Sequence, residues 1–167
     1  VGYAYTSNPI VTISKSSITR KDPINEWKPT VGVSSSYTLN SVDYGNVLVS
    51  VGNNSIHSVS VDGTNWNTSL IGYGGTIGFN AVACGGTNNF IAVGGYGKVT
   101  RAIGYGLTIS SWNELGLLEE AVTPGLGLVI RVGSSYTSTF KSVHYSPVFD
   151  SWTAVGMGGS IFGGVGI

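Results

Sequence analysis

The sequence has few charged residues, and neither sign of charge is concentrated in one segment. Only 10% of its 167 residues are charged, and eight basic side chains balance eight acidic ones. Without a basic stripe the chain lacks the long-range attraction for phosphate backbones or for an anionic membrane surface. It also lacks the run of about 18 apolar residues that a membrane-spanning helix requires. We therefore expect no nucleic-acid partner and no membrane insertion.

Cysteine and histidine are scarce, which limits covalent and metal chemistry. Cys84 is the only cysteine, so an internal disulfide is excluded. We expect it to be a buried apolar residue, because nothing near it in sequence would activate a thiolate. His57 and His144 are far apart in the sequence, whereas a metal site needs three or four clustered ligands. These absences predict no metal, no cofactor and no catalytic residue.

Glycine and neutral polar residues are abundant instead. Glycine occupies 26 positions, and 41% of the residues are hydrophobic. This composition is typical of short strands joined by tight turns rather than of long helices. A net charge of zero gives little self-repulsion and favours assembly with other chains. Because the chain begins with Val1 rather than Met, we expect a processed product or a piece of a longer one.

Four tryptophans recur at intervals of 39, 46 and 40 residues, which indicates an internal repeat. Two further markers recur between them. The first, which we call the Val-Gly run, is an apolar run that ends in Val-Gly. The second, which we call the valine pair, is an apolar residue three positions before a valine. The tryptophans are Trp27, Trp66, Trp112 and Trp152, the Val-Gly runs are 47–52, 90–94 and 128–133, and the valine pairs are Leu39–Val42, Phe79–Val82 and Phe162–Val165, with 119–122 as a degenerate copy.

The order of these markers describes four strands per unit. The valine pair opens the first strand, the Val-Gly run forms the second, an alternating segment such as 56–61 or 10–14 forms the third, and the tryptophan begins the fourth. Alternation places successive side chains on opposite faces of a sheet, whereas a continuously apolar strand is buried on both faces. Four-stranded sheets repeated at about 40 residues are typical of a β-propeller. The sequence therefore predicts an all-β fold, a small β-propeller of about four four-stranded blades.

The whole chain, 1–167, is predicted to form a single propeller-like domain. The expected repeat units are 1–36 plus 157–167, 37–76, 77–117 and 118–156. In this arrangement the C-terminal strand, around Phe162–Gly166, pairs with the N-terminal blade and closes the ring, which hides free sheet edges. The alternatives are part of a larger propeller, a last strand paired with a neighbouring subunit, a β-sandwich and a β-helix.

Two segments depart from the repeat. Trp112–Glu120 contains residues that are poor in strands and tolerated in helices, so we expect a short helical turn there. Arg20–Trp27 is the most charged stretch and contains Pro23, which indicates a solvated loop between the third and fourth strands of the first unit.

The segment Ser60-Val61-Asp62-Gly63-Thr64-Asn65-Trp66 carries a specific turn motif. An aspartate in this place accepts backbone N–H bonds of its own turn, a following glycine supplies a positive φ, and the tryptophan packs between sheets. The pattern S-x-D-G-x-x-W resembles the Asp-box, or BNR-type repeat, of sialidase-like and related propellers. The resemblance implies that the motif lies at the turn between the third and fourth strands, on the face away from the ligand.

In that family the Asp-box is structural and carries no activity. The resemblance therefore implies a structural motif made by Ser60, Asp62, Gly63 and Trp66. The remaining tryptophans, Trp27, Trp112 and Trp152, are expected to fill the repeat core. The repeat rhythm also looks like that of propeller-type repeats in phage and large-virus surface proteins, which predicts an extracellular or virion-surface location.

A sialidase-like glycoside hydrolase is the enzymatic alternative. The resemblance implies three arginines on a substrate carboxylate, where bidentate geometry is needed. The chain has three arginines, Arg20, Arg101 and Arg131, but they fall on different kinds of segment, and the Arg-Ile-Pro motif of that family is absent. No pair of carboxylates stands out as an acid and base for glycoside hydrolysis. We therefore expect no enzymatic activity.

Aromatic and neutral polar side chains support a binding function. Nine tyrosines lie near predicted strand ends or glycine turns, where loops present flat apolar faces beside neutral hydrogen-bonding groups. The candidate ligand-binding aromatics are Tyr73, Tyr96, Tyr105 and Tyr136. The predicted function is a non-catalytic structural or binding module that acts through contacts with other proteins or with copies of itself. A carbohydrate-binding, lectin-like propeller is the first alternative, with glycans as ligands, and the hydrolase is the second.

Overall fold

The backbone of the computed structural model is almost entirely β-strand. Among the residues that it describes, no helix is long and apolar enough to cross a membrane. The helical element among them is a single 3-10 turn, η1 (Gly95–Gly97). The structure describes residues 3–5, 10–14, 17–21, 27–72, 76–86, 88–114, 139–157 and 161–165, and within 30–113 and 139–157 it also describes their side chains.

The strands form four antiparallel sheets, in which consecutive strands pair with each other. The first sheet contains β1 (Tyr3–Tyr5), β2 (Ile10–Ser14), β3 (Ser17–Lys21) and β4 (Trp27–Pro29). The second contains β5 (Leu39–Tyr44), β6 (Leu48–Gly52), β7 (Ile56–Ser60) and β8 (Asn67–Leu70). The third contains β9 (Phe79–Gly85), β10 (Asn89–Gly94), β11 (Val99–Tyr105), β12 (Thr108–Ile109) and β13 (Asn113–Glu114), the last two both paired with β11. The fourth contains β14 (Phe140–Ser146), β15 (Ser151–Gly156) and β16 (Ile161–Val165).

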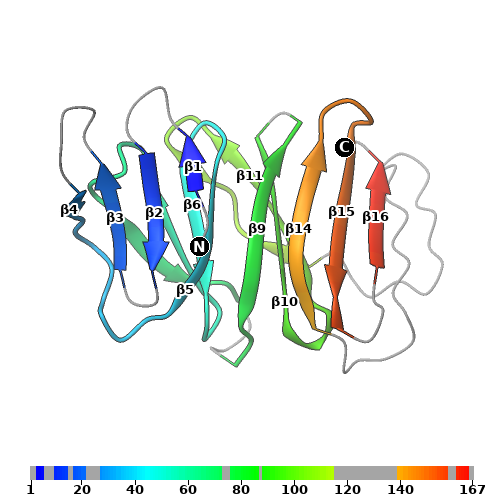
Figure 1. Ribbon diagram of the computed structural model, residues 1–167, viewed down its shortest axis with the longest axis horizontal. Coiled ribbons are helices and arrows are strands. Elements are labelled where there is room, and N and C mark those ends of the chain that lie inside the picture. The colour runs from blue at the N-terminus through cyan, green and yellow to red at the C-terminus, as the bar shows by residue number, and fades with distance from the viewer. Residues whose placement is uncertain are drawn as a thin grey trace.

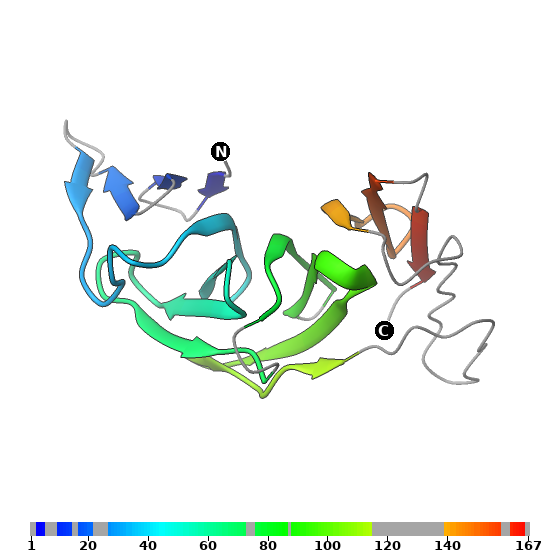
Figure 2. The ribbon, with the colours of Figure 1, turned by 90° about the horizontal axis from the view of Figure 1, so that it is seen from below.

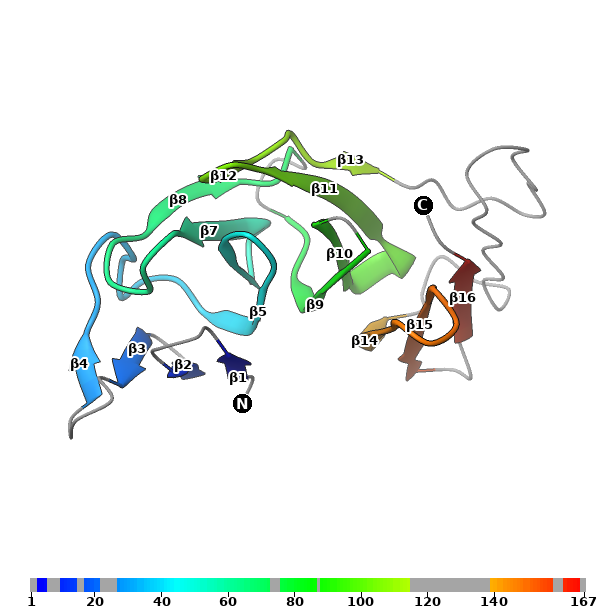
Figure 3. The ribbon, with the colours of Figure 1, turned by 90° about the horizontal axis from the view of Figure 1, so that it is seen from above.

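The four sheets stand side by side along an open arc (Figures 1 and 2). The first strands of the sheets lie on the inner side of the arc, and outer strands such as β8 and β12 lie on its outer rim (Figure 3). Neighbouring inner strands are in contact, from β1 to β5, from β5 to β9 and from β9 to β14. This radial arrangement of antiparallel meanders is that of a β-propeller, as the sequence predicts.

An apolar core lies between the second and third sheets, and another lies between the third and fourth. Between the second and third sheets, Val49 and Val51 of β6 pack with Phe90 of β10. On the opposite face of β10, Ile91 and Val93 pack against the fourth sheet. Both β6 and β10 are buried along their whole length, because a sheet covers each of their faces. The continuous apolar character of the Val-Gly runs follows from this double burial.

In three sheets a glycine at the end of the second strand lies close to the backbone just before the first strand of the same sheet. A Cβ atom on Gly52, Gly94 or Gly156 would lie 2.0, 2.2 or 2.4 Å from the carbonyl oxygen of the residue before the first strand. The same carbonyl accepts the N–H of the residue after the glycine, at 2.9 Å in all three sheets. The glycine of the Val-Gly run is therefore required by lack of space.

A bulge in the first strand directs a side chain to the next sheet. Pairing shifts at Asn40 in β5 and at the equivalent Asn80 in β9. Asn40 donates its side-chain N–H to the carbonyl of Phe79 at 2.8 Å, and Asn80 donates to the carbonyl of Phe140 at 2.6 Å. These bonds join the inner strands of neighbouring sheets and fix how the sheets align.

The fourth sheet begins later than the tryptophan spacing predicts. Phe140 and Val143 form the valine pair that opens β14, and both are buried as in the other sheets. Trp152 is not at the start of a fourth strand: it lies in β15, four residues before Gly156, as Phe90 lies before Gly94 in β10. Either aromatic ring fills the core at this position, so the tryptophan interval gives the wrong strand here.

The predicted ring closure does not occur within this chain. The C-terminal strand β16 pairs with β15, from Val165 opposite Ser151 to Ile161 opposite Val155. It is the third strand of its own sheet, because it follows the Val-Gly pair of β15. The same reassignment applies at the N-terminus, where 10–14 is the second strand, β2, and not a third strand.

Two local expectations also change. Arg20 and Lys21 are the last residues of β3 and are not part of a loop, since they pair with both β2 and β4. Asn113–Glu114 form β13, where the sequence predicts a helical turn, because they pair with Thr100 and Arg101 of β11. The rest of these two segments, other than Trp27 and Trp112, and the Val-Gly run at 128–133 lie outside the described residues.

Replacing Gly94 with alanine is expected to lower the free energy of unfolding by about 1–3 kcal/mol, because the added Cβ would overlap the Gly78 carbonyl. Urea unfolding followed by tryptophan fluorescence measures the change. Gly72→Ala is the matched control, since a Cβ at Gly72 meets no atom within 4 Å. Equal stability of the two variants would contradict the steric role of Gly94.

Candidate functional site

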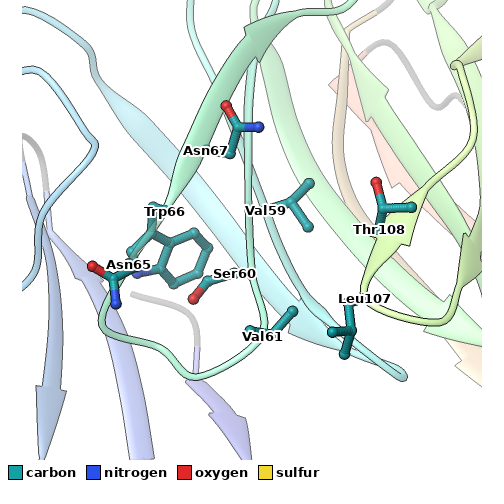
Figure 4. Close-up of a pocket in the computed structure, with 8 residues that line it drawn as sticks. All are labelled: Val59, Ser60, Val61, Asn65, Trp66, Asn67, Leu107 and Thr108. Carbon is teal, nitrogen blue, oxygen red and sulfur yellow. The ribbon is translucent and has the colours of Figure 1, made fainter.

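A continuous groove runs between the second and third sheets on the outer rim of the arc. Its two ends have volumes of about 340 and 470 Å³, and they share Val59, Asn67 and Thr108. One wall comes from β7 and β8, and the other from β12 and the turn before it. Figure 4 shows the first end, where Val61 and Leu107 approach each other from the two walls. We call this feature the inter-sheet groove.

A turn held by the Asp62 carboxylate forms one end of the groove. Its Oδ1 accepts the backbone N–H of Thr64 at 2.7 Å and of Asn65 at 2.9 Å, and its Oδ2 accepts the Asn65 side-chain amide at 3.1 Å. The Ser60 hydroxyl accepts the N–H of Gly63 at 2.9 Å, and Gly63 has a φ of 70°. Backbone donors that would otherwise be unpaired are thus satisfied within the turn.

Trp66 anchors this turn to an apolar cluster with Leu39, Val42, Leu48 and Ile56 of the second sheet. Its ring is 5% exposed, and its Nε1 donates to the Gly63 carbonyl at 3.3 Å. The segment after β4 lies alongside: Val31 donates its N–H to Thr64 and accepts the N–H of Trp66, both at 3.0 Å. The end of the groove is therefore a fixed structure.

The pKa of Asp62 is lowered from its usual value of 3.8. Desolvation by burial raises this pKa, but the hydrogen bonds from Asn65, Thr64 and Ser60 favour the carboxylate and outweigh the desolvation. The side chain is therefore ionised at neutral pH, which is the form that holds the turn.

His57 and Trp112 line the other end of the groove. Their ring centroids are 5.9 Å apart with an interplanar angle of 71°, an edge-on contact. Burial lowers the pKa of His57 to about 4, so the imidazole is neutral at pH 7. Within the described part of the chain, His57 Nδ1 and Trp112 Nε1 are buried without a hydrogen-bond partner. Both atoms therefore have an unused hydrogen-bonding capacity inside the protein.

The described residues that line the groove carry no charged side chain at neutral pH. Leu70 and Leu107 stand 58% and 74% exposed at its margins. Among the described strands, none pairs with the outer edge of β8, which is joined only to β7. The segment after β4 approaches the start of this edge, where the Thr68 hydroxyl donates to the Gly32 carbonyl at 2.8 Å. The groove thus combines apolar side chains, neutral amides and hydroxyls, and a strand edge with which no described strand pairs.

The surroundings of Cys84 do not favour a nucleophile. Burial and the nearby Asp43 carboxylate raise the pKa of Cys84 to about 12, so the thiol stays protonated. Asp43 accepts the backbone N–H of Cys84 at 2.7 Å, and burial raises the pKa of Asp43 despite this bond. In the described residues, no group of three or more His, Cys, Asp or Glu side chains could hold a metal ion.

The three arginines are not seen to converge on one site. Arg101 in β11 donates Nε and Nη2 to the Asn89 carbonyl oxygen Oδ1, at 3.0 and 2.7 Å. Arg20 belongs to β3 of the first sheet, and Arg131 lies outside the described residues. Arg101 is therefore engaged within the third sheet.

The candidate tyrosines do not form one surface either. Tyr96 and Tyr105 are 64% and 59% exposed, but they lie at opposite ends of β11, whose seven residues span about 20 Å. Tyr73 and Tyr136 lie outside the described residues.

The tryptophans have different environments. Trp66 and Trp152 are buried in two different inter-sheet cores, whereas Trp112 is only partly buried. Trp27 begins β4, and its side chain lies outside the described set.

Sequence reasoning missed the inter-sheet groove. Val59, Leu70 and Leu107 belong to different repeat units or different strands, and no local pattern links them. A usable signal is Leu107, a large apolar residue that follows Gly106 in a turn, since turns normally carry polar residues.

The arc of sheets defines the class of fold as a β-propeller, and comparison with known structures agrees. No family model and no curated protein matches the sequence. Among solved structures, the chain is similar to YCF48 bound to D1 peptide, with a TM-score of 0.68 and 16% identity. It is also similar to YCF48 from Cyanidioschyzon merolae, with a TM-score of 0.66 and 12% identity. Each comparison covers 99% of this chain and 50% of the other, so the chain spans half the length of these structures.

Asp62→Ala is expected to lower the free energy of unfolding by about 1 kcal/mol at pH 7, because the N–H groups of Thr64 and Asn65 lose their acceptor at an exposed site. Since the folded pKa is below that of the unfolded chain, this contribution is present above about pH 4 and is lost as the pH falls through the folded pKa. Urea unfolding at pH 7 and pH 3 should therefore show a smaller difference between wild type and variant at pH 3.

Asp62→Asn is the matched control, because it keeps an acceptor oxygen and removes the charge. We expect it to retain part of the stability and to lose the pH dependence. A difference between wild type and Asp62→Ala that is the same at both pH values would contradict the assignment.

Proposed function

We propose that the chain is a non-catalytic binding module whose inter-sheet groove holds an extended, uncharged peptide segment of a protein partner. The observation that carries the proposal is the outer edge of β8, with which no described strand pairs, beside a groove whose described lining residues are uncharged. A peptide strand added to such an edge gains backbone hydrogen bonds, and its alternate side chains point into the groove.

The size of the groove sets the length of the segment. β8 has four residues, so its edge is about 13 Å long and pairs with about four to six residues of an extended peptide. Apolar side chains of the peptide would contact Val59, Leu70 and Leu107, and its polar backbone would face Asn67 and Thr108. An aspartate, glutamate or lysine side chain in the groove would lose hydration without gaining an ionic partner.

A sugar ligand suits the groove less well than a peptide does. Sugars are commonly held by exposed aromatic faces, but Trp66 is only 5% exposed and Trp112 is partly covered by His57. The exposed Tyr96 and Tyr105 lie at opposite ends of a strand. The lectin alternative therefore lacks an aromatic platform among the described residues.

The chemistry of the titratable groups supports binding rather than catalysis. The Cys84 thiol is protonated at neutral pH, and His57 Nδ1 has no hydrogen-bonded hydroxyl or thiol among the described residues. A nucleophile needs a base within hydrogen-bond reach. A peptide-binding role is also in keeping with the similar structure of YCF48, which is bound to D1 peptide.

We further propose that this module works on an extracellular or virion surface. The low charge of the sequence and its many aromatic and neutral polar residues support this location. Mass spectrometry of purified particles and of the extracellular fraction tests this location. Recovery of the chain only from the cell interior would contradict it.

A random peptide library displayed on phage, selected against the whole chain, tests the groove. We expect enriched peptides to be uncharged, with alternating apolar residues, and to bind Leu107→Asp at least about tenfold more weakly, because the new charge would lie at the margin of the apolar groove. Tyr96→Asp is the matched control, since it places the same charge at an equally exposed apolar site elsewhere. Equal binding to wild type and Leu107→Asp would refute the site. Hits on a glycan array without any enriched peptide would refute the ligand class.

A further inference from the structure

The fourth sheet exposes a face that the second and third sheets bury. Counting back from the glycine at the end of each second strand, Val155 occupies the position of Val51 and of Val93. Val51 and Val93 are fully buried by the sheet that follows them, whereas Val155 is 47% exposed. Thr153, on the same face of β15, is also exposed.

The inner strand of the fourth sheet also carries the side chains that link sheets elsewhere. Lys141 lies at the bulge position of Asn40, whose amide donates to the next inner strand at 2.8 Å. Ser142 lies at the position of Ser41, whose hydroxyl accepts the Val82 N–H at 3.2 Å. Lys141 and Ser142 are both exposed. β14 and β15 thus present a side-chain donor, a hydroxyl acceptor and an apolar contact that another sheet would meet.

The first sheet is the complementary end of the arc. Its inner strand, β1, contacts β5 on one side, in the way that β5 contacts β9 and β9 contacts β14. Figures 2 and 3 show the first and fourth sheets at opposite ends of the open arc. Every other inner strand follows a preceding sheet, so β1 is the strand that can take the place of the missing neighbour of β14.

We propose that the exposed face of β14 and β15 binds the first sheet of a second copy of this chain, and that two copies close one ring. The same contact then occurs twice, related by a twofold axis, and leaves neither end of the arc open. The similar propeller structures are twice the length of this chain, so two copies supply the same amount of propeller. A net charge of zero adds no repulsion between copies. This inference is independent of the peptide-binding groove.

Analytical ultracentrifugation of the whole chain tests the proposal. We expect a species of twice the 17.3 kDa chain mass at micromolar concentration. Val155→Asp should weaken the association at least about tenfold, because it places a charge in the centre of the contact. Val148→Asp is the matched control, since Val148 is 82% exposed in the turn between β14 and β15 and outside this face.

Cross-linking of an equal mixture of isotopically light and heavy chains identifies the surfaces in contact. We expect mixed links between Lys141 of one copy and Lys21 or Lys28 of the first sheet of the other. Circular dichroism confirms that Val155→Asp remains folded. A monomer throughout the concentration range, a dimer that Val155→Asp leaves unchanged, or mixed links that leave out the first sheet would each overturn the proposal.

Discussion

The packing of one sheet against the next is the constraint on which the rest of the structure depends. A single meander here has two apolar faces and no core of its own, so residues such as Val49 and Ile91 are buried only because a neighbouring sheet covers them. The strand-end glycines let the end of each second strand approach the backbone before the first strand of the same sheet. The bulge asparagines align adjacent inner strands. Because inner strands converge and outer strands diverge, a groove opens at the rim between β8 and β12. The binding site is thus a geometric result of how the core is built.

Much of the fold is readable from the sequence because its determinants are local. Three sequence patterns reflect whether neighbouring sheets bury one or both faces of a strand, and the structure has strands at all three. They are the alternation in 56–61, the continuous apolar run in 90–94 and the valine pair that begins at Phe79. The tryptophan spacing predicts the wrong start for the fourth sheet. This marker follows one residue type, whereas the core position only requires a large aromatic ring. Trp152 and Phe90 fill equivalent core positions, and a large aromatic ring of either kind serves there. The marker that opens β14 is the pair formed by Phe140 and Val143, which is not among the pairs identified from the sequence.

The candidate site could not be read in the same way. The groove is lined by β7 and β8 from one repeat unit and by the turn at Leu107 from the next. No local sequence pattern predicts which outer strands are separated by such a groove. The contact between His57 and Trp112, and the unpaired nitrogen atoms of both, depend on two sheets meeting. The Asp62 turn is the exception, because all the hydrogen bonds of the Asp62 carboxylate come from residues within a few positions of it in the chain.

The bonds by which Asn40 and Asn80 link sheets join each inner strand to the adjacent one. Stability along the arc is therefore nearly one-dimensional, a sum of terms for each sheet and for each contact between neighbours. Amide hydrogens in the second and third sheets are shielded from two sides and should exchange with solvent most slowly, while the end sheets open first. Such a chain can gain or lose a whole unit in evolution while the packing of the others is preserved, because the main contacts between the described sheets join neighbours.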